Sequence, residues 1–169
     1  MEISYPVMQT RDRPNYYLRK NFYKQYSYLG TPFLSENCDI RKSDNIIIYG
    51  HNINNSKMFG ELENYHNEKF YQSHKSIEFY TLEEVKKYEI IFVFKISVND
   101  DFMYYNFTNF NNEIEFESFI KNCEILSLYN TESSVKYGDR FMTLSTCDYS
   151  IKDGRLVIVA KESEIQEFH

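Results

Sequence analysis

Apolar positions along this chain recur mainly at the spacing of β-strands. Some stretches alternate apolar with polar side chains, as half-buried strands do, and others are short continuous apolar runs bounded by turn residues, as buried strands are. The strands that this pattern predicts are residues 3–9, a short strand entered through a turn within 30–34, 45–49, one kinked strand made of 70–74 and 77–80, 88–98, 135–146 and 156–160. We therefore expect a mainly β protein.

Helical spacing occurs in two longer segments. Apolar side chains recur at helical intervals over residues 58–66, with Ser56 placed to cap the start. A longer amphipathic helix is predicted behind Asn112, a suitable N-cap, because apolar positions then follow i, i+3, i+4, i+7 at Phe116, Phe119, Ile120 and Cys123. Residues 81–84 match the capping-box pattern, which predicts one more turn of helix. The fold predicted is α+β, with helices at the periphery of the sheet.

Length, composition and charge limit the class of protein. A chain of 169 residues fits one domain with its own core, and no repeat, low-complexity tract or linker divides it. The net charge of −6 does not favour nucleic acid as a partner. No apolar run approaches the roughly 20 residues that a membrane span needs, and the first residues do not resemble a signal peptide.

Three predicted strand ends carry side chains able to do chemistry. The run over residues 141–147 ends in Cys147, and the next β-rich run begins at Arg155 after a polar turn. If these two strands are neighbours, the thiol and the guanidinium share one end of the sheet, as a thiolate nucleophile with a positive partner requires. A third strand ends in Tyr49-Gly50-His51, and His51 is a candidate proton carrier.

The motifs Thr143-Leu144-Ser145-Thr146-Cys147, Arg155 and Tyr49-Gly50-His51 resemble those of sortases, cysteine transpeptidases that attach proteins to the cell wall of Gram-positive bacteria. The resemblance covers about residues 3–161, and the helix predicted before the cysteine strand is similar to one that distinguishes class B. It implies a closed β-barrel of about eight strands with two or three peripheral helices, one of them inserted before the strand carrying the cysteine. It also implies one sortase catalytic domain over residues 1–169.

The resemblance assigns a catalytic role to each of three residues. Cys147 would attack a peptide carbonyl and form a thioacyl enzyme. His51 would protonate the leaving amine and then take a proton from the incoming nucleophile, and Arg155 would hydrogen-bond substrate carbonyls and the oxyanion. The competing interpretations are a small buried cysteine, a structural histidine at a strand end and an arginine in a surface salt bridge.

Four further residues are candidate substrate contacts. The resemblance assigns Leu18 to one wall of the substrate groove. It also assigns substrate contacts to Tyr49 and Ser145, which lie two residues before His51 and Cys147 and so share their faces of the strands. Asp148 follows the nucleophile directly; it is a candidate to orient the substrate or His51, and a solvated turn acid is the alternative.

The sequence predicts no cofactor and no metal. His66 and His74 lack the tight spacing of zinc ligands, and no dense carboxylate loop suggests calcium. The two remaining cysteines, Cys38 and Cys123, are either joined in a disulfide or are two buried, inert thiols, and we favour the second interpretation.

The resemblance also implies partners and a location. The expected substrates are a sorting-motif peptide, cut after a Thr, and a peptidoglycan amine that accepts the surface protein; we expect a monomer. Sortases carry an N-terminal membrane anchor, whereas this chain opens with Met1-Glu2 directly before a predicted strand. We therefore expect an anchor and a first helix that are not part of this sequence, and a domain at the extracellular face of the membrane.

Two other classes of cysteine enzyme do not fit the order of the motifs. Papain-like proteases place the nucleophile before the histidine, and caspases have about half of the separation found here between His51 and Cys147. Two alternatives remain within the sortase fold. One is a thiol endopeptidase that releases the acyl group to water, and the other is a non-catalytic peptide-binding module.

Overall fold

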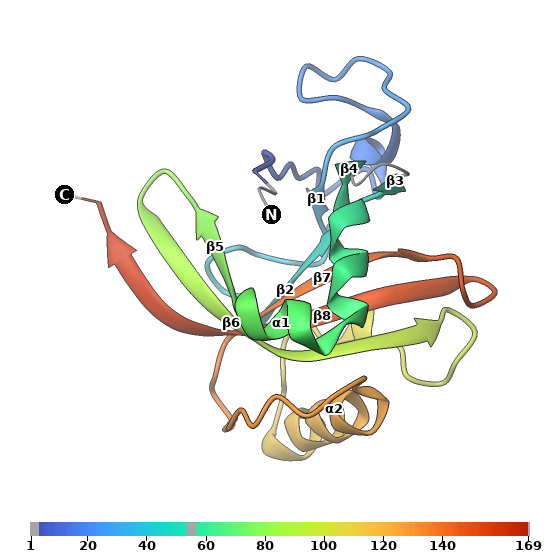
Figure 1. Cartoon of the computed structure of the whole chain (residues 1–169). Coiled ribbons are helices and arrows are strands. Elements are labelled where there is room, and N and C mark those ends of the chain that lie inside the picture. Colours follow the sequence, from blue (N-terminus) through green and yellow to red (C-terminus); the bar gives the residue numbers. More distant parts are fainter. Residues whose placement is uncertain (1–3, 54–56, 169) are drawn as a thin grey trace.

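A curled six-stranded sheet forms the centre of the protein (Figure 1). The computed structural model describes residues 4–53 and 57–168. Along the sheet the strand order is β1-β2-β7-β8-β6-β5. Strands β2 and β7 pair in parallel, and the other four neighbouring pairs in this sheet are antiparallel. The strands are β1 (Phe33–Leu34), β2 (Asn45–Tyr49), β5 (Ser76–Tyr80), β6 (Glu84–Ser97), β7 (Phe141–Asp148) and β8 (Gly154–Glu167).

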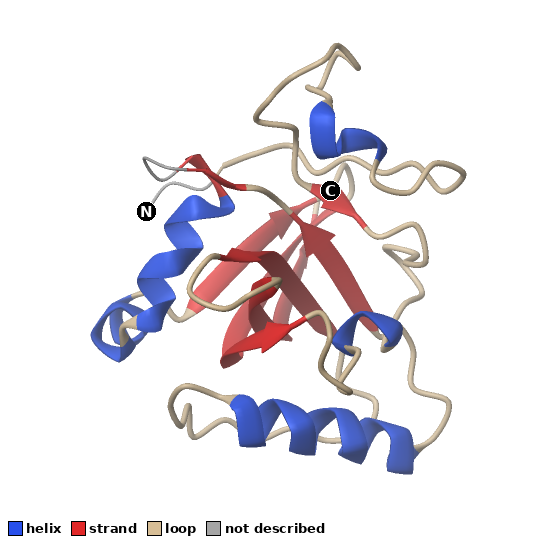
Figure 2. Cartoon of the chain, turned by 90° about the vertical axis from the view of Figure 1, so that its right-hand side faces the viewer, coloured by secondary structure: helices blue, strands red, loops and turns tan. Residues whose placement is uncertain are grey.

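Helices and one small hairpin surround this sheet (Figure 2). Helix α2 lies across one side, while η2 and α1 follow one another along a different side. The hairpin pairs β3 (Asn52–Ile53) with β4 (Lys57–Met58). The helices are η1 (Tyr16–Arg19), η2 (Phe59–His66), α1 (Glu68–Ser73), η3 (Tyr104–Asn106) and α2 (Glu113–Leu126).

The long pair β6 and β8 gives the sheet its curl. Their register shifts between Lys87 and Tyr88 and again between Ile90 and Phe92. Irregularities of this kind bend a strand and increase its twist. The curl is that of a partly closed barrel, because β1 and β5 remain the two edges of the hydrogen-bonded sheet among the described residues. The mainly β fold with peripheral helices is as predicted, and the closure is less complete than expected.

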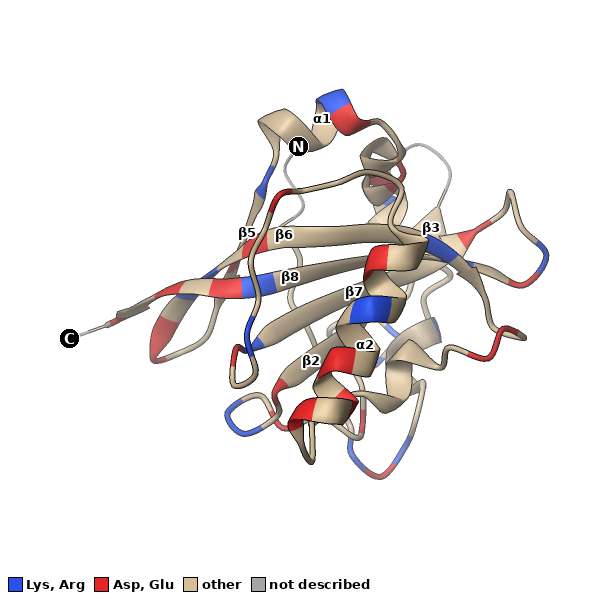
Figure 3. Ribbon diagram, turned by 90° about the horizontal axis from the view of Figure 1, so that it is seen from below, with Lys and Arg blue, Asp and Glu red and all other residues tan. Residues whose placement is uncertain are grey.

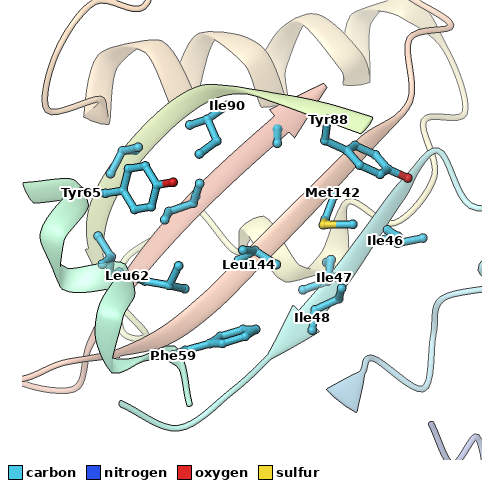
Figure 4. Packing of buried hydrophobic residues seen from close by; sticks show 14 of the residues in the cluster. Ile46, Ile47, Ile48, Phe59, Leu62, Tyr65, Tyr88, Ile90, Met142 and Leu144 are labelled. Atoms are coloured by element: carbon cyan, nitrogen blue, oxygen red, sulfur yellow. The ribbon is translucent and has the colours of Figure 1, made fainter. Parts of the chain in front are cut away.

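Buried side chains form a separate cluster on each face of the sheet. Figure 4 shows Leu62 and Tyr65 of η2 directed toward Met142 and Leu144 of β7 in the first cluster. The second cluster is built around α2, with Phe119 fully buried against Phe141. Charged residues lie mainly on loops, on the outward side of α2 and toward the ends of the long strands (Figure 3).

The positions of Cys38 and Cys123 in the two clusters show whether they can form a disulfide. Cys38 is buried in the first cluster and Cys123 in the second, so the sheet separates them and a disulfide between them is not formed. Both are free thiols in the structure. Burial raises the pKa of each above its ordinary value, as expected for inert thiols in apolar surroundings.

Several predicted elements are correct and others are wrong. Strand β2 matches its predicted range, and Asn112 caps α2 by accepting a hydrogen bond from the backbone N–H of Glu115 at 2.9 Å. The chain over residues 70–74, predicted as strand, belongs largely to helix α1. Residues 81–83 form the turn between β5 and β6, and Glu84 already belongs to β6, so the predicted turn of helix is absent.

The first predicted strand is also wrong in its described part. Over residues 4–9 the chain has a single β-bridge, between Met8 and Phe33. The predicted strand over residues 135–146 is shorter than expected at its start, since β7 begins at Phe141. The proposed cap Ser56 lies outside the described residues, although the helix it was expected to start is present as η2. Within the described ranges, no helix combines the length and apolar character needed to cross a membrane.

Candidate active site

Cys147 and Arg155 lie directly opposite one another on the antiparallel strands β7 and β8. Side chains at directly opposed positions of such a pair point to the same face, with their Cβ atoms about 5 Å apart. Both residues are partly exposed. The arginine also donates a hydrogen bond from Nη1 to the carbonyl of Gly154 at 2.8 Å, which holds its side chain close to the strand end. The two strands are therefore neighbours, and Cys147 and Arg155 lie at the same end of the sheet.

His51 is brought to the same end of the sheet by the chain that follows β2. The N–H of Gly50 continues the parallel ladder to the carbonyl of Ser145 at 3.1 Å, and Thr146 donates from Oγ1 to the carbonyl of Gly50 at 2.8 Å. On the other side of His51, Nδ2 of Asn52 donates to the carbonyl of Cys147 at 2.9 Å. Both neighbours of the histidine are thus bonded to the strand that carries the cysteine.

The imidazole of His51 is oriented by the backbone at Leu18. Its Nε2 lies 2.8 Å from the carbonyl oxygen of Leu18. Because a carbonyl oxygen only accepts, Nε2 carries a hydrogen, and this bond fixes the direction of the ring. Leu18 is 37% exposed, and the part of it that contacts His51 is the backbone carbonyl; its role as a groove wall stays a prediction.

Ser145 and Tyr49, the two predicted substrate contacts beside the catalytic residues, differ in burial and in their neighbours. Ser145 is buried, and its Oγ forms a hydrogen bond of 2.7 Å with the hydroxyl of Tyr104. Burial raises the pKa of that tyrosine, and nearby Arg155 opposes the rise, so the hydroxyl stays protonated. Tyr49 is partly buried with its ring 5.5 Å from that of Phe33. Ser145 is thus bonded to Tyr104 in the protein interior next to the site. No sequence motif indicated Tyr104.

Asp148 does not face His51, so the expected orienting contact is wrong. Strand β7 extends to Asp148, and alternation along a strand directs this side chain to the face opposite that of Cys147. Its carboxylate lies 3.1 Å from Nε2 of His66 and 3.2 Å from Nζ of Lys95, and it accepts hydrogen bonds from the backbone and hydroxyl of Ser150. The carboxylate is buried in this polar cluster and anchors the end of the strand.

Asn52, which the sequence motifs did not single out, and Gly50, named there only as part of Tyr49-Gly50-His51, are supporting residues. The amide of Asn52 donates to Oε1 of Glu63 at 2.6 Å in addition to its bond with Cys147. Position 50 requires glycine because the ring of Phe59 packs against its backbone, and a Cβ there would lie 2.6 Å from that ring. Their positions on either side of His51 are a signal that sequence reasoning could have used.

The described residues contain no group of three or more His, Cys, Asp and Glu side chains arranged to hold a metal ion. His66 and His74, which were considered as metal ligands, have other contacts. His66 binds Asp148, and the ring of His74 stacks on that of Phe70 with centroids 4.0 Å apart. The chemistry available at the site is that of a thiol, an imidazole and a guanidinium.

A curled β-sheet with a cysteine and an arginine on paired strands, and a histidine at the end of the adjoining parallel strand, defines the sortase class of domain. The chain belongs to the sortase family: the family model described as a sortase domain matches residues 1–163. This confirms the resemblance found in the motifs.

The relatives are of class B. The chain is 31% identical to sortase B of Staphylococcus aureus over 94% of its length and 32% identical to sortase B of Listeria monocytogenes over 95%. It spans 65% of the length of each of these two relatives. The structure of Clostridium perfringens sortase B matches with a TM-score of 0.87 at 32% identity, covering 95% of this chain and 87% of that chain.

A substrate-bound relative has the same fold. The Staphylococcus aureus sortase B-substrate complex matches with a TM-score of 0.85 at 31% identity, over 95% of this chain and 74% of that chain. Class B sortase structures therefore share the fold described above.

Proposed function

We propose that this protein is a cysteine transpeptidase of the sortase B type. The observation that carries the proposal is the direct pairing of Cys147 with Arg155, with His51 held alongside by the hydrogen bonds of its two neighbours. Each side chain has a task that suits its chemistry, and membership of the sortase family supports the assignment.

In the proposed first half-reaction, the sulfur of Cys147 attacks the carbonyl carbon of a peptide bond. The oxygen of that carbonyl becomes an oxyanion, and the fork of donors on Arg155 stabilises it. The C–N bond then breaks as protonated His51 gives its proton to the leaving amine. The products are a thioacyl enzyme and a free C-terminal fragment.

In the second half-reaction an acceptor amine attacks the thioester. His51 takes the proton that the amine loses, the C–S bond breaks, and the cysteine sulfur leaves as the thiolate. If water attacks instead, the acyl group is released as a carboxylate, and the protein acts as a thiol endopeptidase. The ratio of the two products depends on which nucleophile reaches the thioester faster.

The finer assignments follow from the sortase resemblance. We propose that the substrate is the C-terminal sorting motif of a surface protein, cut after a Thr, and that the acceptor is an amine of peptidoglycan. The structure of the relative from Staphylococcus aureus is a sortase B-substrate complex, which supports a substrate-binding role for this fold. Sortases act at the Gram-positive cell surface, and we place this domain there, membrane-anchored on the extracellular face.

The test is cleavage of a fluorescent sorting-motif peptide, with and without an amine acceptor. We expect cleavage by the wild type, an amine adduct that increases with acceptor concentration, and no cleavage by Cys147→Ala. Cys123→Ala is the matched control, since it removes a thiol buried on the second cluster and is expected to retain activity. Equal cleavage by wild type and Cys147→Ala would overturn the proposal. Cleavage without any adduct would assign the endopeptidase.

A further inference from the structure

Residues 19–28 form a finger that projects from the molecule beside the site (Figures 1 and 2). Its backbone is a small hairpin: Lys20 and Tyr26 are paired in an antiparallel bridge, and the N–H of Ser27 donates to the carbonyl of Arg19 at 3.0 Å. At the tip, Asn21 donates to the carbonyl of Gln25 at 2.9 Å. The finger is therefore an ordered element with a defined tip.

Large aromatic side chains of the finger are exposed. The exposed fractions are 53% for Phe22, 78% for Tyr23, 74% for Tyr26 and 65% for Tyr28. None of these four belongs to either buried cluster. The rings of Phe22 and Tyr23 are in contact, with centroids 5.5 Å apart. Four large exposed rings within ten residues that add nothing to the core are typical of interaction surfaces.

The same segment is basic in an acidic protein. The finger contains Arg19, Lys20 and Lys24 and no Asp or Glu, and the stretch without acidic residues extends over residues 13–35. The whole chain, by contrast, has 25 acidic and 19 basic residues. Helix α2, with its glutamates, lies on the opposite side of the sheet from the finger (Figures 1 and 3). The charge of the finger is thus complementary to an anionic partner, whereas the residues outside 13–35 carry 25 acidic and 15 basic side chains and are acidic overall.

The shape of the finger indicates the kind of partner. Peptides bind in grooves or along sheet edges, and small ligands bind in concave pockets, but the finger is convex. Two cavities lie elsewhere, one lined by residues including Phe92 and Tyr129 and the other by residues including Glu63 and His66. A convex tip with aromatic and basic side chains suits the flat interface of a bilayer, where aromatic rings lie among the headgroups and cations attract anionic lipids.

We propose that the finger binds the surface of an anionic lipid bilayer. Phe22 and Tyr23 insert among the headgroups, and Lys20 and Lys24 lie over the lipid phosphates. At physiological salt the Debye length is about 8 Å, so the acidic residues on the far side of the sheet are screened from the bilayer. Because Leu18, next to the finger, holds His51, this contact turns the His51 end of the sheet toward the membrane.

The charge part of the proposal is tested by vesicle flotation at low ionic strength. Vesicles of equal parts phosphatidylglycerol and phosphatidylcholine are compared with vesicles of phosphatidylcholine alone. We expect binding to the anionic vesicles and its loss as salt is added. The double variant Lys20→Gln, Lys24→Gln should bind about 25-fold more weakly, since each basic side chain near an anionic surface contributes about fivefold.

The matched control is Lys87→Gln, Lys121→Gln, which changes the net charge equally at two exposed positions outside the finger. It should bind as the wild type does. If both double variants lost vesicle binding equally, the binding would depend on overall charge and not on the finger, and the proposal would be overturned. Absence of wild-type binding to the anionic vesicles at low salt would do the same.

The aromatic part is tested with Phe22→Ser, Tyr23→Ser, which should also weaken vesicle binding. Its control is Leu82→Ser, Ile114→Ser, where side chains exposed by 101% and 79% lie far from the finger in sequence. Cleavage of the soluble peptide should be unchanged in all four double variants, which shows that they fold. Binding to purified cell-wall glycan without binding to vesicles would assign the finger to a different partner and overturn the proposal.

Discussion

Asn52 donates a hydrogen bond of 2.9 Å to the backbone carbonyl of Cys147. The same amide group donates to the carboxylate of Glu63 in η2, so one side chain joins three segments at the site. It directly follows His51 in the chain. The relative position of histidine and cysteine is thus set by a residue that, in the mechanism proposed, does not itself react.

We predict that Asn52→Ala lowers the activity by lowering kcat more than it raises KM. The variant leaves a carbonyl and a carboxylate without their donor, a loss of about 1–3 kcal/mol in the free energy of unfolding, and frees the His51 segment to move. Small misplacements of catalytic groups reduce rates strongly. Peptide-cleavage kinetics and thermal unfolding measure the two effects. A stability loss with unchanged kcat would show that Asn52 is only structural.

Arg155→Lys is expected to lose most of the activity although the charge is kept. The guanidinium offers several donors in a rigid plane, whereas an ammonium is a flexible point charge. Loss of one oxyanion donor typically costs a hundredfold to a thousandfold in kcat. Cleavage rates for wild type, Arg155→Lys and Arg155→Ala give the comparison. If lysine restored wild-type rates, the arginine would act through charge alone.

The buried pair of Tyr104 and Ser145 should contribute to stability as a unit. Tyr104→Phe leaves the serine hydroxyl without its 2.7 Å partner, and Ser145→Ala leaves the tyrosine hydroxyl unpaired. We expect each single variant to lose about 1–2 kcal/mol and the double variant to lose less than the sum. Urea unfolding of the four proteins completes the cycle. Strictly additive losses would mean that the hydroxyls do not depend on one another.

The reactive residues could be predicted from sequence because each one lies within two residues of a strand end. Cys147, Arg155 and His51 lie where apolar runs meet polar turns, and the register of neighbouring strands then brings them together. Tyr104 could not be found in this way, since it belongs to a short 3-10 helix in a long connection. Its contact with Ser145 spans 41 residues of sequence and depends on how that connection packs.

The wrong predictions have local physical causes. The segment over residues 70–74 is too short for apolar spacing to separate strand from helix, and Asn67 decides the matter by capping α1 through a bond from Lys69 N–H. Thr81 accepts bonds from the N–H groups of Glu83 and Glu84 as a helix cap would, but the chain turns into β6 instead. Local hydrogen bonds of this kind serve turns and caps equally.

The cluster of Asp148, His66 and Lys95 should make stability depend on pH. Burial alone would raise the pKa of Asp148, but hydrogen bonds from Ser150 and Lys95 outweigh it, and the pKa lies below its ordinary value. Burial and the charge of Lys95 lower the pKa of His66, although Asp148 and Glu63 oppose this. His66 is therefore neutral at pH 7, with its Nε2 3.1 Å from Oδ2 of the carboxylate.

Both shifts reduce stability as the pH falls. Below about pH 6.5 the unfolded chain protonates His66 while the folded protein resists, so the free energy of unfolding decreases. Below about pH 4 the unfolded chain likewise protonates Asp148 before the folded protein does. Urea unfolding across this range should show the first decrease in the wild type but not in His66→Gln. A stability difference between these two proteins that stayed constant from pH 7.5 to about pH 5 would contradict the assignment of this decrease to His66.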